Sequence, residues 1–178
     1  MSVSLRDAKG SAADRLWIQG AFPEYLQELA RVSAASTGVF PVLGEHGARD
    51  GELLARWFRD DRSHPVLILD GGRAAGFALV SRPLMTAKAG AAPEFRMAEF
   101  FVHPRNRRRG IGRAAAVLLF SRFAGQWEVA EATGNAEAVS FWRDVITDYT
   151  HGRYQERVRD GEVRQSFVSG SSASLARP

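Results

Sequence analysis

Residues 100–113 read FFVHPRNRRRGIGR, and this stretch decides the fold of the 178-residue chain. An apolar strand end runs into clustered arginines and then into Gly110 and Gly112, which precede apolar residues at helical spacing. A helix that begins at about Gly110 leaves its first backbone N–H groups unpaired and carries partial positive charge there. Such a terminus binds phosphate, and glycine allows close approach. The stretch therefore predicts an anion site, with a solvated basic loop that only caps the helix as the alternative.

Length and composition indicate one soluble globular domain. The chain is 45% hydrophobic and 25% charged, and its formal net charge of +4 suits an anionic ligand. It has no cysteine, which excludes a disulfide framework and a thiol nucleophile, and its four histidines lie far apart, so we expect no metal site. Without a membrane-length apolar run or a signal-peptide core, we expect a cytoplasmic protein with no membrane partner.

Strands and helices alternate on both sides of the opening stretch. Residues 66–69 and 74–80 are apolar runs around the turn sequence DGGR, which predicts a β-hairpin, and residues 94–102 form the next predicted strand. The apolar series at 16–29 has helical spacing, but the segment GAFP at 20–23 predicts a break into two helical pieces. With the remaining apolar patterns, the predicted order is a strand, a helical pair, three strands, a helix, a strand, a helix and two strands.

The end of the chain reads as a closing hairpin. Residues 149–158 and 162–168 form two predicted strands across Asp160-Gly161, so Tyr149 falls at a strand start. Residues 169–178 are small and polar, and we expect them to be disordered. The domain prediction is therefore one domain over 1–168 with a short tail.

The element order resembles the GNAT family of acetyl-CoA dependent N-acetyltransferases. Its Arg/Gln-x-x-Gly-x-Gly/Ala loop matches residues 107–112, and the strand-to-proline step before it is similar. A second family element matches Asn135, Ala138, Phe141 and Trp142. The resemblance implies an α+β fold in α/β/α layers, with a mixed, mostly antiparallel, twisted sheet of about seven strands and about four helices.

The resemblance also implies acetyl-CoA as co-substrate and no metal. The backbone at about 108–113 would hold the pyrophosphate, and the strand before it would pair with the pantetheine arm. Asn135 would contact that arm or act only as a helix N-cap, and Trp142 would wall the thioester pocket. The implied coenzyme-binding positions are Phe101, Val102, Arg107, Arg108, Arg109, Gly110, Ile111, Gly112, Arg113, Asn135 and Trp142.

The catalytic residues are less determined by the sequence. The family often has a tyrosine acid where this chain has Trp142, and an indole cannot donate a proton at neutral pH. Tyr149 is the substitute we consider, with a packing role or protonation by water as alternatives. For the general base we select Glu99, whose apolar neighbours would raise its pKa, although it can equally face solvent or pair with an arginine. His103 is the second choice.

The leading functional hypothesis is acetyl transfer from acetyl-CoA to a primary amine by direct attack in a ternary complex. A GNAT-like module that binds acyl-CoA without catalysis is one alternative. A nucleic-acid-binding module that uses the arginines of 105–113 is another, and it is disfavoured because the aromatic residues follow core periodicity. The acceptor, a small molecule or a peptide, stays open. The last strands allow a homodimer.

Overall fold

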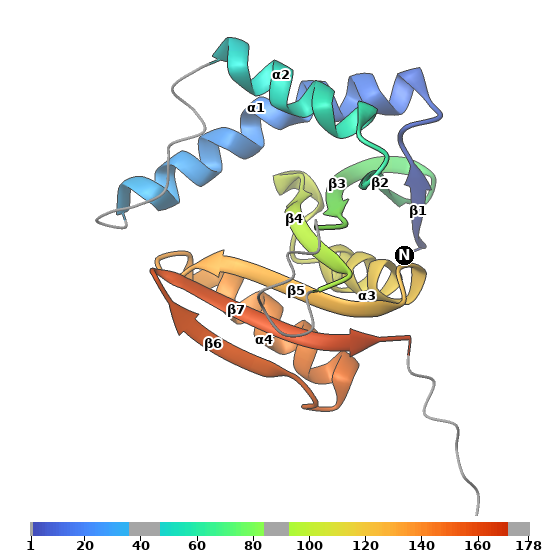
Figure 1. Ribbon diagram of the computed structural model, residues 1–178. Coiled ribbons are helices and arrows are strands. Elements are labelled where there is room, and N and C mark those ends of the chain that lie inside the picture. The colour runs from blue at the N-terminus through green and yellow to red at the C-terminus, as the bar shows by residue number, and fades with distance from the viewer. Residues whose placement is uncertain (1, 36–46, 84–92, 171–178) are drawn as a thin grey trace, which may run out of the picture.

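The computed structural model describes residues 2–35, 47–83 and 93–170, which form one sheet and its covering helices (Figure 1). The strands are β1 (Val3–Asp7), β2 (Ser63–Asp70), β3 (Arg73–Ser81), β4 (Phe95–Val102), β5 (Gly125–Ala132), β6 (Gln155–Arg159) and β7 (Glu162–Ser169). The α-helices are α1 (Ala12–Ala35), α2 (Gly47–Arg59), α3 (Ile111–Arg122) and α4 (Ala136–Thr150), and a 3₁₀ turn spans Pro104–Asn106.

The seven strands lie in the order β1-β2-β3-β4-β5-β7-β6. Every neighbouring pair is antiparallel except β4 with β5. The predicted hairpin forms from β2 and β3, and its turn glycines, Gly71 and Gly72, both have positive φ, which suits a two-residue connection. The predicted mixed, mostly antiparallel sheet is therefore confirmed.

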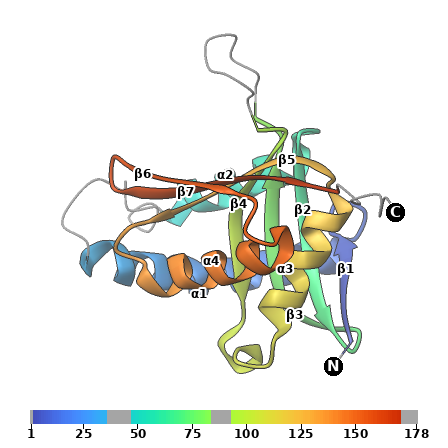
Figure 2. The same cartoon turned by 90° about the horizontal axis from the view of Figure 1, so that it is seen from below.

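Helices cover both faces of the sheet, as Figures 1 and 2 show from two directions. On one face, α1 and α2 pack on β2, β3 and β4 through a cluster that includes Ile18, Phe22, Phe58 and Phe77. On the other face, α3 and α4 pack through a cluster centred on Phe120 and Trp127, both fully buried. This α/β/α layering is the predicted one.

Strands β4 and β5 pair over only three residues each. Phe95–Met97 face Trp127–Val129, and beyond these residues the structure records no pairing between the two strands. They separate, with β3 and α1 on the β4 side and β7 and β6 on the β5 side (Figure 1). The site described below lies in this opening.

Two expectations about helices are wrong. Helix α1 is continuous through Pro23, because Phe22, Tyr25 and Leu26 bury their side chains against the sheet and offset the hydrogen bond that a proline loses. Helix α4 extends to Thr150 and ends at His151, which adopts φ 53°, so Tyr149 belongs to the last turn of the helix and not to a strand.

The C-terminal boundary differs by one residue from the expectation. Ser169 ends β7, and its side-chain hydroxyl donates to the carbonyl of Phe123 at 3.0 Å, which ties it to the end of α3. The rest of the predicted tail, from 171 onward, lies outside the described residues. Strand β6 forms one edge of the sheet, where the predicted homodimer contact would lie, and that contact stays a prediction.

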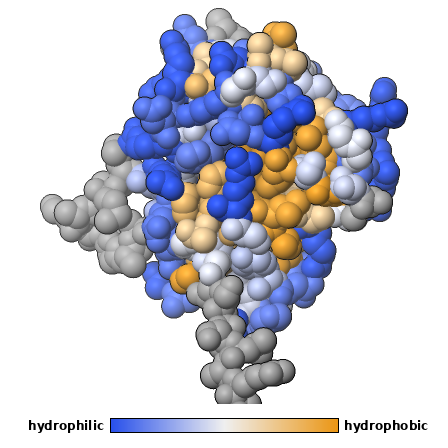
Figure 3. All heavy atoms as spheres, turned by 90° about the vertical axis from the view of Figure 1, so that its right-hand side faces the viewer, coloured by the Kyte–Doolittle hydropathy of each residue, from blue (hydrophilic) through white to orange (hydrophobic). Residues whose placement is uncertain are grey.

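The surface seen from the right of Figure 1 carries a hydrophobic patch at its centre, bordered by hydrophilic residues (Figure 3). Helix α3 and strand β1 are on this side in Figure 1. Among the described residues, no helix has the length and apolarity that a membrane crossing requires.

Candidate active site

A cavity of about 1060 Å³ occupies the opening between β4 and β5. Its walls come from α1, from β4 and the turn that follows it, from the start of α3, and from β5, α4 and β7. It contains most of the residues that the sequence selected. Those that line it are Glu99, Phe101, Val102, Arg107, Arg108, Gly110, Ile111, Gly112, Arg113, Asn135 and Trp142.

The start of α3 presents backbone donors to this cavity. Gly110 is the N-cap with φ 73°, and the first bond of the helix runs from the N–H of Ala114 to the carbonyl of Gly110 at 3.0 Å. The N–H groups of residues 111–113 therefore precede the helical ladder. A Cβ on Gly112 would lie 3.4 Å from the Phe141 ring, so the Phe141 side chain packs close to the main chain at Gly112. The geometry fits a phosphate group.

Four arginines between 107 and 113 have carboxylate partners. Arg107 Nη2 lies 2.6 Å from Glu28 and its Nε donates to the Val102 carbonyl at 2.7 Å, so this side chain joins the turn to α1. Arg109 pairs with Asp70 at 3.1 Å and, unlike the other predicted positions of the turn, does not line the cavity.

The two remaining arginines bridge the turn and α3 to α4. Arg108 lies 2.8 Å from Glu137, and Arg113 pairs with Asp148. All four arginines of this cluster are therefore anchored by acids, and three of them line the cavity.

Strand β4 has an open edge beside the start of α3. Its other edge pairs with β3, where Phe101 faces Phe77 and Val102 faces Gly76. The close fit of this pair is shown by Gly76, where an added Cβ would lie 2.2 Å from the Phe101 carbonyl. On the β5 side, residues 98–102 have no strand partner within the described parts of the chain. An extended ligand can pair here as a strand would.

Helix α4 contributes Asn135 and Trp142 to the cavity wall. The Asn135 side-chain oxygen accepts from the Ala138 N–H at 3.2 Å, so Asn135 is an N-cap and also lines the cavity. Trp142 is 5% exposed and makes an edge contact with Phe100 at 5.0 Å between ring centroids. The N-cap role of Asn135 is therefore compatible with a contact between its side chain and a ligand in the cavity.

Tyr149 lies outside this cavity. Its ring packs against Phe120 at 5.3 Å and Phe167 at 6.3 Å between centroids, on the core side of α4. Tyr149 therefore has the packing role that we considered as an alternative. It takes this position because α4 continues past residue 149, where the sequence predicted the start of a strand. It is not placed to protonate a leaving group in the cavity.

Glu99 is held by Tyr25 of α1, whose hydroxyl donates to the Glu99 carboxylate. Desolvation raises the pKa of Glu99 to about 7, while the hydrogen bond from Tyr25 acts in the opposite direction. Burial first, and then the charge of Glu99, raise the pKa of Tyr25 well above its usual value, so Tyr25 stays a proton donor in this bond. A carboxylate with a pKa near neutrality suits proton transfer.

His103 is engaged outside the cavity. Its Nδ1 accepts from the Arg105 N–H at 3.3 Å, and its Nε2 lies 3.4 Å from Glu24 on α1. It caps the 3₁₀ turn and does not line the cavity. Glu99 is therefore the better placed of the two candidate bases.

Two residues of the site were not found from the sequence. From the sequence, Tyr25 is one of the apolar series of a helix and is assigned to the core. Its hydrogen bond to Glu99 was missed because the two residues are 74 positions apart. Glu131 on β5 is 9% exposed, and neither of its carboxylate oxygens has a hydrogen-bond partner in the described structure. Burial, together with the nearby Glu156 and Glu162, raises the pKa of Glu131 to about 8. A glutamate in an alternating strand carries no sign of such burial.

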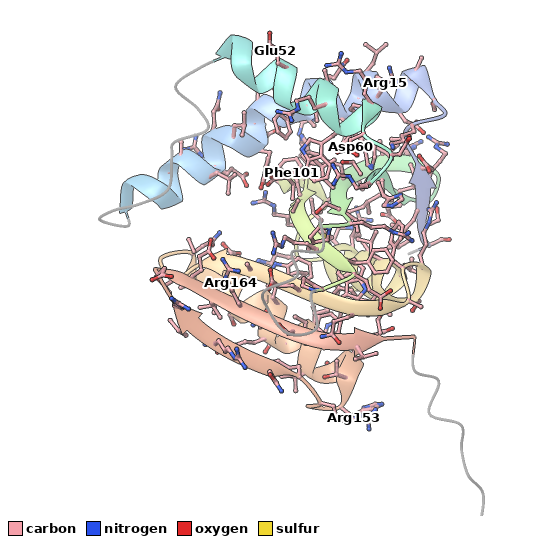
Figure 4. All side chains as sticks on the ribbon, viewed as in Figure 1. Arg15, Glu52, Asp60, Phe101, Arg153 and Arg164 are labelled. Atoms are coloured by element: carbon pink, nitrogen blue, oxygen red, sulfur yellow. The ribbon has the colours of Figure 1, made fainter. Side chains whose placement is uncertain are left out.

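The face of the cavity opposite α3 and α4 holds a charged group that the sequence also did not predict. Arg96 of β4 lies 2.6 Å from Glu128 of β5, its register partner. Arg164 of β7 lies 3.7 Å from the same Glu128 oxygen and 2.5 Å from Glu162. Arg164 projects from β7 into the space below α1 (Figure 4).

The sequence matches the model of the acetyltransferase (GNAT) family over residues 26–145, which is more than half of the chain. The chain belongs to this family. The match includes β4, the arginine-glycine turn, α3, β5 and most of α4, which form much of the cavity wall. No curated protein sequence matches the chain.

Solved structures of GNAT acetyltransferases share the fold at low sequence identity. A GNAT family acetyltransferase from Streptococcus agalactiae is 14% identical, with a TM-score of 0.63 and coverage of 94% of this chain and 95% of its own. An acetyltransferase, YncA, from Salmonella typhimurium, solved with its cofactor acetyl-CoA, is 12% identical, with a TM-score of 0.60 and coverage of 94% of both chains.

An enzyme of stated acceptor also shares the fold. The ribosomal-protein-S18-alanine N-acetyltransferase from Escherichia coli is 14% identical, with a TM-score of 0.52 and coverage of 99% of this chain and 100% of its own. At these identities the likeness concerns the fold. Within the described residues, no cluster of three or more His, Cys, Asp or Glu side chains is arranged to hold a metal ion.

Proposed function

We propose that this chain transfers an acetyl group from acetyl-CoA to a primary amine. One observation carries the proposal: a single cavity contains the open edge of β4 at 98–102, which includes Glu99, and then the free N–H groups at the start of α3. Bound acetyl-CoA supplies the acetyl group as a thioester. The remaining tasks belong to residues of this chain.

The binding roles follow from the free backbone donors. N–H groups at 111–113 and the preceding turn would hold the diphosphate, with Gly112 permitting its approach to the main chain. The open edge of β4 at 98–102 would align the pantetheine arm and direct an N–H toward the thioester oxygen. The amide of Asn135 would contact the same arm.

Glu99 would take the proton of the attacking amine. The reaction forms the N–C bond and breaks the C–S bond, and the amine proton moves to the Glu99 carboxylate, directly or through water. Tyr25 would hold that carboxylate in one orientation. Trp142 is an indole, so we assign protonation of the thiolate to water, and Trp142 forms part of the wall.

The two alternatives make different predictions. A coenzyme-binding protein without catalysis is favoured by Trp142 in the position of the family's tyrosine. Nucleic-acid binding is disfavoured because four of the five arginines in 105–113, namely Arg107, Arg108, Arg109 and Arg113, are paired with carboxylates.

Acetyl-CoA binding followed by turnover on an amine panel separates these possibilities. Isothermal titration with acetyl-CoA should give binding at micromolar to millimolar concentration, and mass spectrometry should then detect acetylated amine with free thiol. Binding without product across a broad panel would support the non-catalytic alternative, and no binding would refute the proposal.

A further inference from the structure

Arg96 and Arg164 lie on the α1 side of the cavity, the side of Glu99. Phe95 and Met97 pack in the cluster beneath α3 and α4, so Arg96 between them points to the other face. The same alternation places Arg164 opposite Phe167. Tyr25 of α1 contacts Glu99, which places this carboxylate on the same face.

Arg96 and Arg164 form a charged cluster with Glu128 and Glu162, and their two guanidinium groups are the most accessible part of it. The Arg96 and Arg164 side chains are 42% and 46% exposed, while those of Glu128 and Glu162 are 14% and 24% exposed. The carboxylates therefore lie beneath the guanidinium groups and orient them. Glu128 accepts from Nε and Nη2 of Arg96 through one oxygen, and a guanidinium has five N–H donors in all.

The local charge argues against a polycationic acceptor. The ionisable groups on this side are Glu28, Arg96, Glu99, Arg107, Glu128, Glu162 and Arg164. Among the described residues, Glu28 is paired with Arg107, and Glu99 titrates near neutrality, so this part of the chain presents no unpaired acidic cluster to the amine. Two arginines from different strands that share Glu128 as a partner suit a planar anionic group.

Resting on the proposed function, we propose that the acceptor is an amine that also carries a carboxylate, which binds between Arg96 and Arg164 while its amino group lies at Glu99. Arg96 and Glu99 are three residues apart on β4, at most about 10 Å along the strand, and the β-bulge at Ala98 between them brings both side chains to one face. Because arginine side chains span much of that length, a short or medium amino acid reaches both.

Matched amines test this inference. Acetylation of glycine, β-alanine, 4-aminobutyrate and 6-aminohexanoate should be compared with 4-aminobutanamide and butylamine, using kcat/KM for the free-amine form. We expect the best amino acid to exceed the amide and the alkylamine by about 10-fold or more, as loss of a charge-assisted contact predicts. A peptide with N-terminal Ala and Asp in second position, beside its Asn counterpart, distinguishes a peptide source from a free amino acid.

Variants assign the preference to the two arginines. Arg96→Gln and Arg164→Gln should remove most of the preference, so that kcat/KM falls far more for the amino acid than for butylamine. Arg96→Lys keeps the charge and should retain part of it. Arg153→Gln, at an exposed arginine near the end of α4 (Figure 4), is the matched control, and thermal melts check folding.

Equal turnover of the amino acid, amide and alkylamine by the wild type would overturn the inference. An equal loss on all amines in Arg96→Gln and Arg164→Gln would also overturn it. If acetyl-CoA binds and no amine is acetylated, the proposed function fails separately. Titration of 4-aminobutyrate into the coenzyme A complex then decides the inference, which requires binding by the wild type and loss of binding in both variants.

Discussion

Glu99 is the residue on which the proposed chemistry depends. Because its pKa is raised to about 7, the base form increases as pH rises through neutrality, and kcat/KM should rise with it. Glu99→Gln should abolish this rising limb of the pH profile and reduce kcat by about 10²-fold or more, with little change in acetyl-CoA affinity. Glu52→Gln, which changes an exposed residue of α2, is the control (Figure 4). A variant that keeps both rate and limb would exclude Glu99 as the base.

Tyr25 sets the behaviour of that carboxylate. Its hydrogen bond stabilises ionised Glu99, so Tyr25→Phe should raise the pKa of Glu99 and move the limb of the kcat/KM profile to higher pH. Tyr154→Phe, outside the cavity, should leave the profile in place. A limb that stays in place or moves to lower pH in Tyr25→Phe would show that this bond does not hold the base.

Glu131 links stability to pH. Its pKa in the folded state, about 8, lies above its ordinary value of 4.5, so the folded state binds more protons than the unfolded chain between these values. The wild type should therefore lose stability as pH rises from about 5 to 8. Glu131→Gln should remove this loss, with little difference at pH 5 and a gain on the order of 2–4 kcal/mol at pH 8. Urea unfolding at both values measures it, and a constant difference would contradict the burial.

At the scale of elements, the start of α3 is the predicted coenzyme cradle. A Cβ on Gly112 meets Phe141 at 3.4 Å and Val102 Cγ2 at 3.6 Å, so Gly112→Ala fits in van der Waals contact, and we expect the two further methyl groups of Gly112→Val to collide with these neighbours. Gly112→Val should weaken acetyl-CoA binding by about 10-fold or more, because the added methyl groups displace the α3 terminus or the ligand.

Gly20→Ala in α1 is the control for this change, since nothing lies within 4 Å of the Cβ added there. Titration calorimetry on folded protein, checked by circular dichroism, gives the comparison. Unchanged affinity in Gly112→Val would place the coenzyme elsewhere.

Much of this element structure was predictable because its signals are local. The strand, turn and glycines of 100–113 carry the cradle in consecutive residues, and the hairpin turn at Gly71 and Gly72 is equally local. The break expected before Pro23 did not form because packing of Phe22 and Tyr25 on the sheet is a tertiary effect. For the same reason the contact of Tyr25 with Glu99, and the group of Arg96, Glu128 and Arg164, were not foreseen.

At the scale of the whole molecule, the coenzyme would bridge the two halves of the sheet, which join through only three residues of β4. Acetyl-CoA at 100 times its Kd should therefore raise Tm by about 5–10 °C. Acetyl-pantetheine, which lacks the diphosphate, should raise it less at equal concentration because the cradle stays unused. Equal shifts would indicate that the start of α3 does not bind the diphosphate.

Amide hydrogen exchange with and without acetyl-CoA tests the central claim most directly, namely that the opening between β4 and β5 binds the coenzyme. Residues 98–102 and 108–113 should gain protection, because those of their N–H groups that face the opening would pair with the pantetheine arm and the diphosphate. The amides of the β6–β7 connection, outside this opening, should not change. Binding without protection in those two segments, or with protection confined to other parts of the chain, would contradict the account.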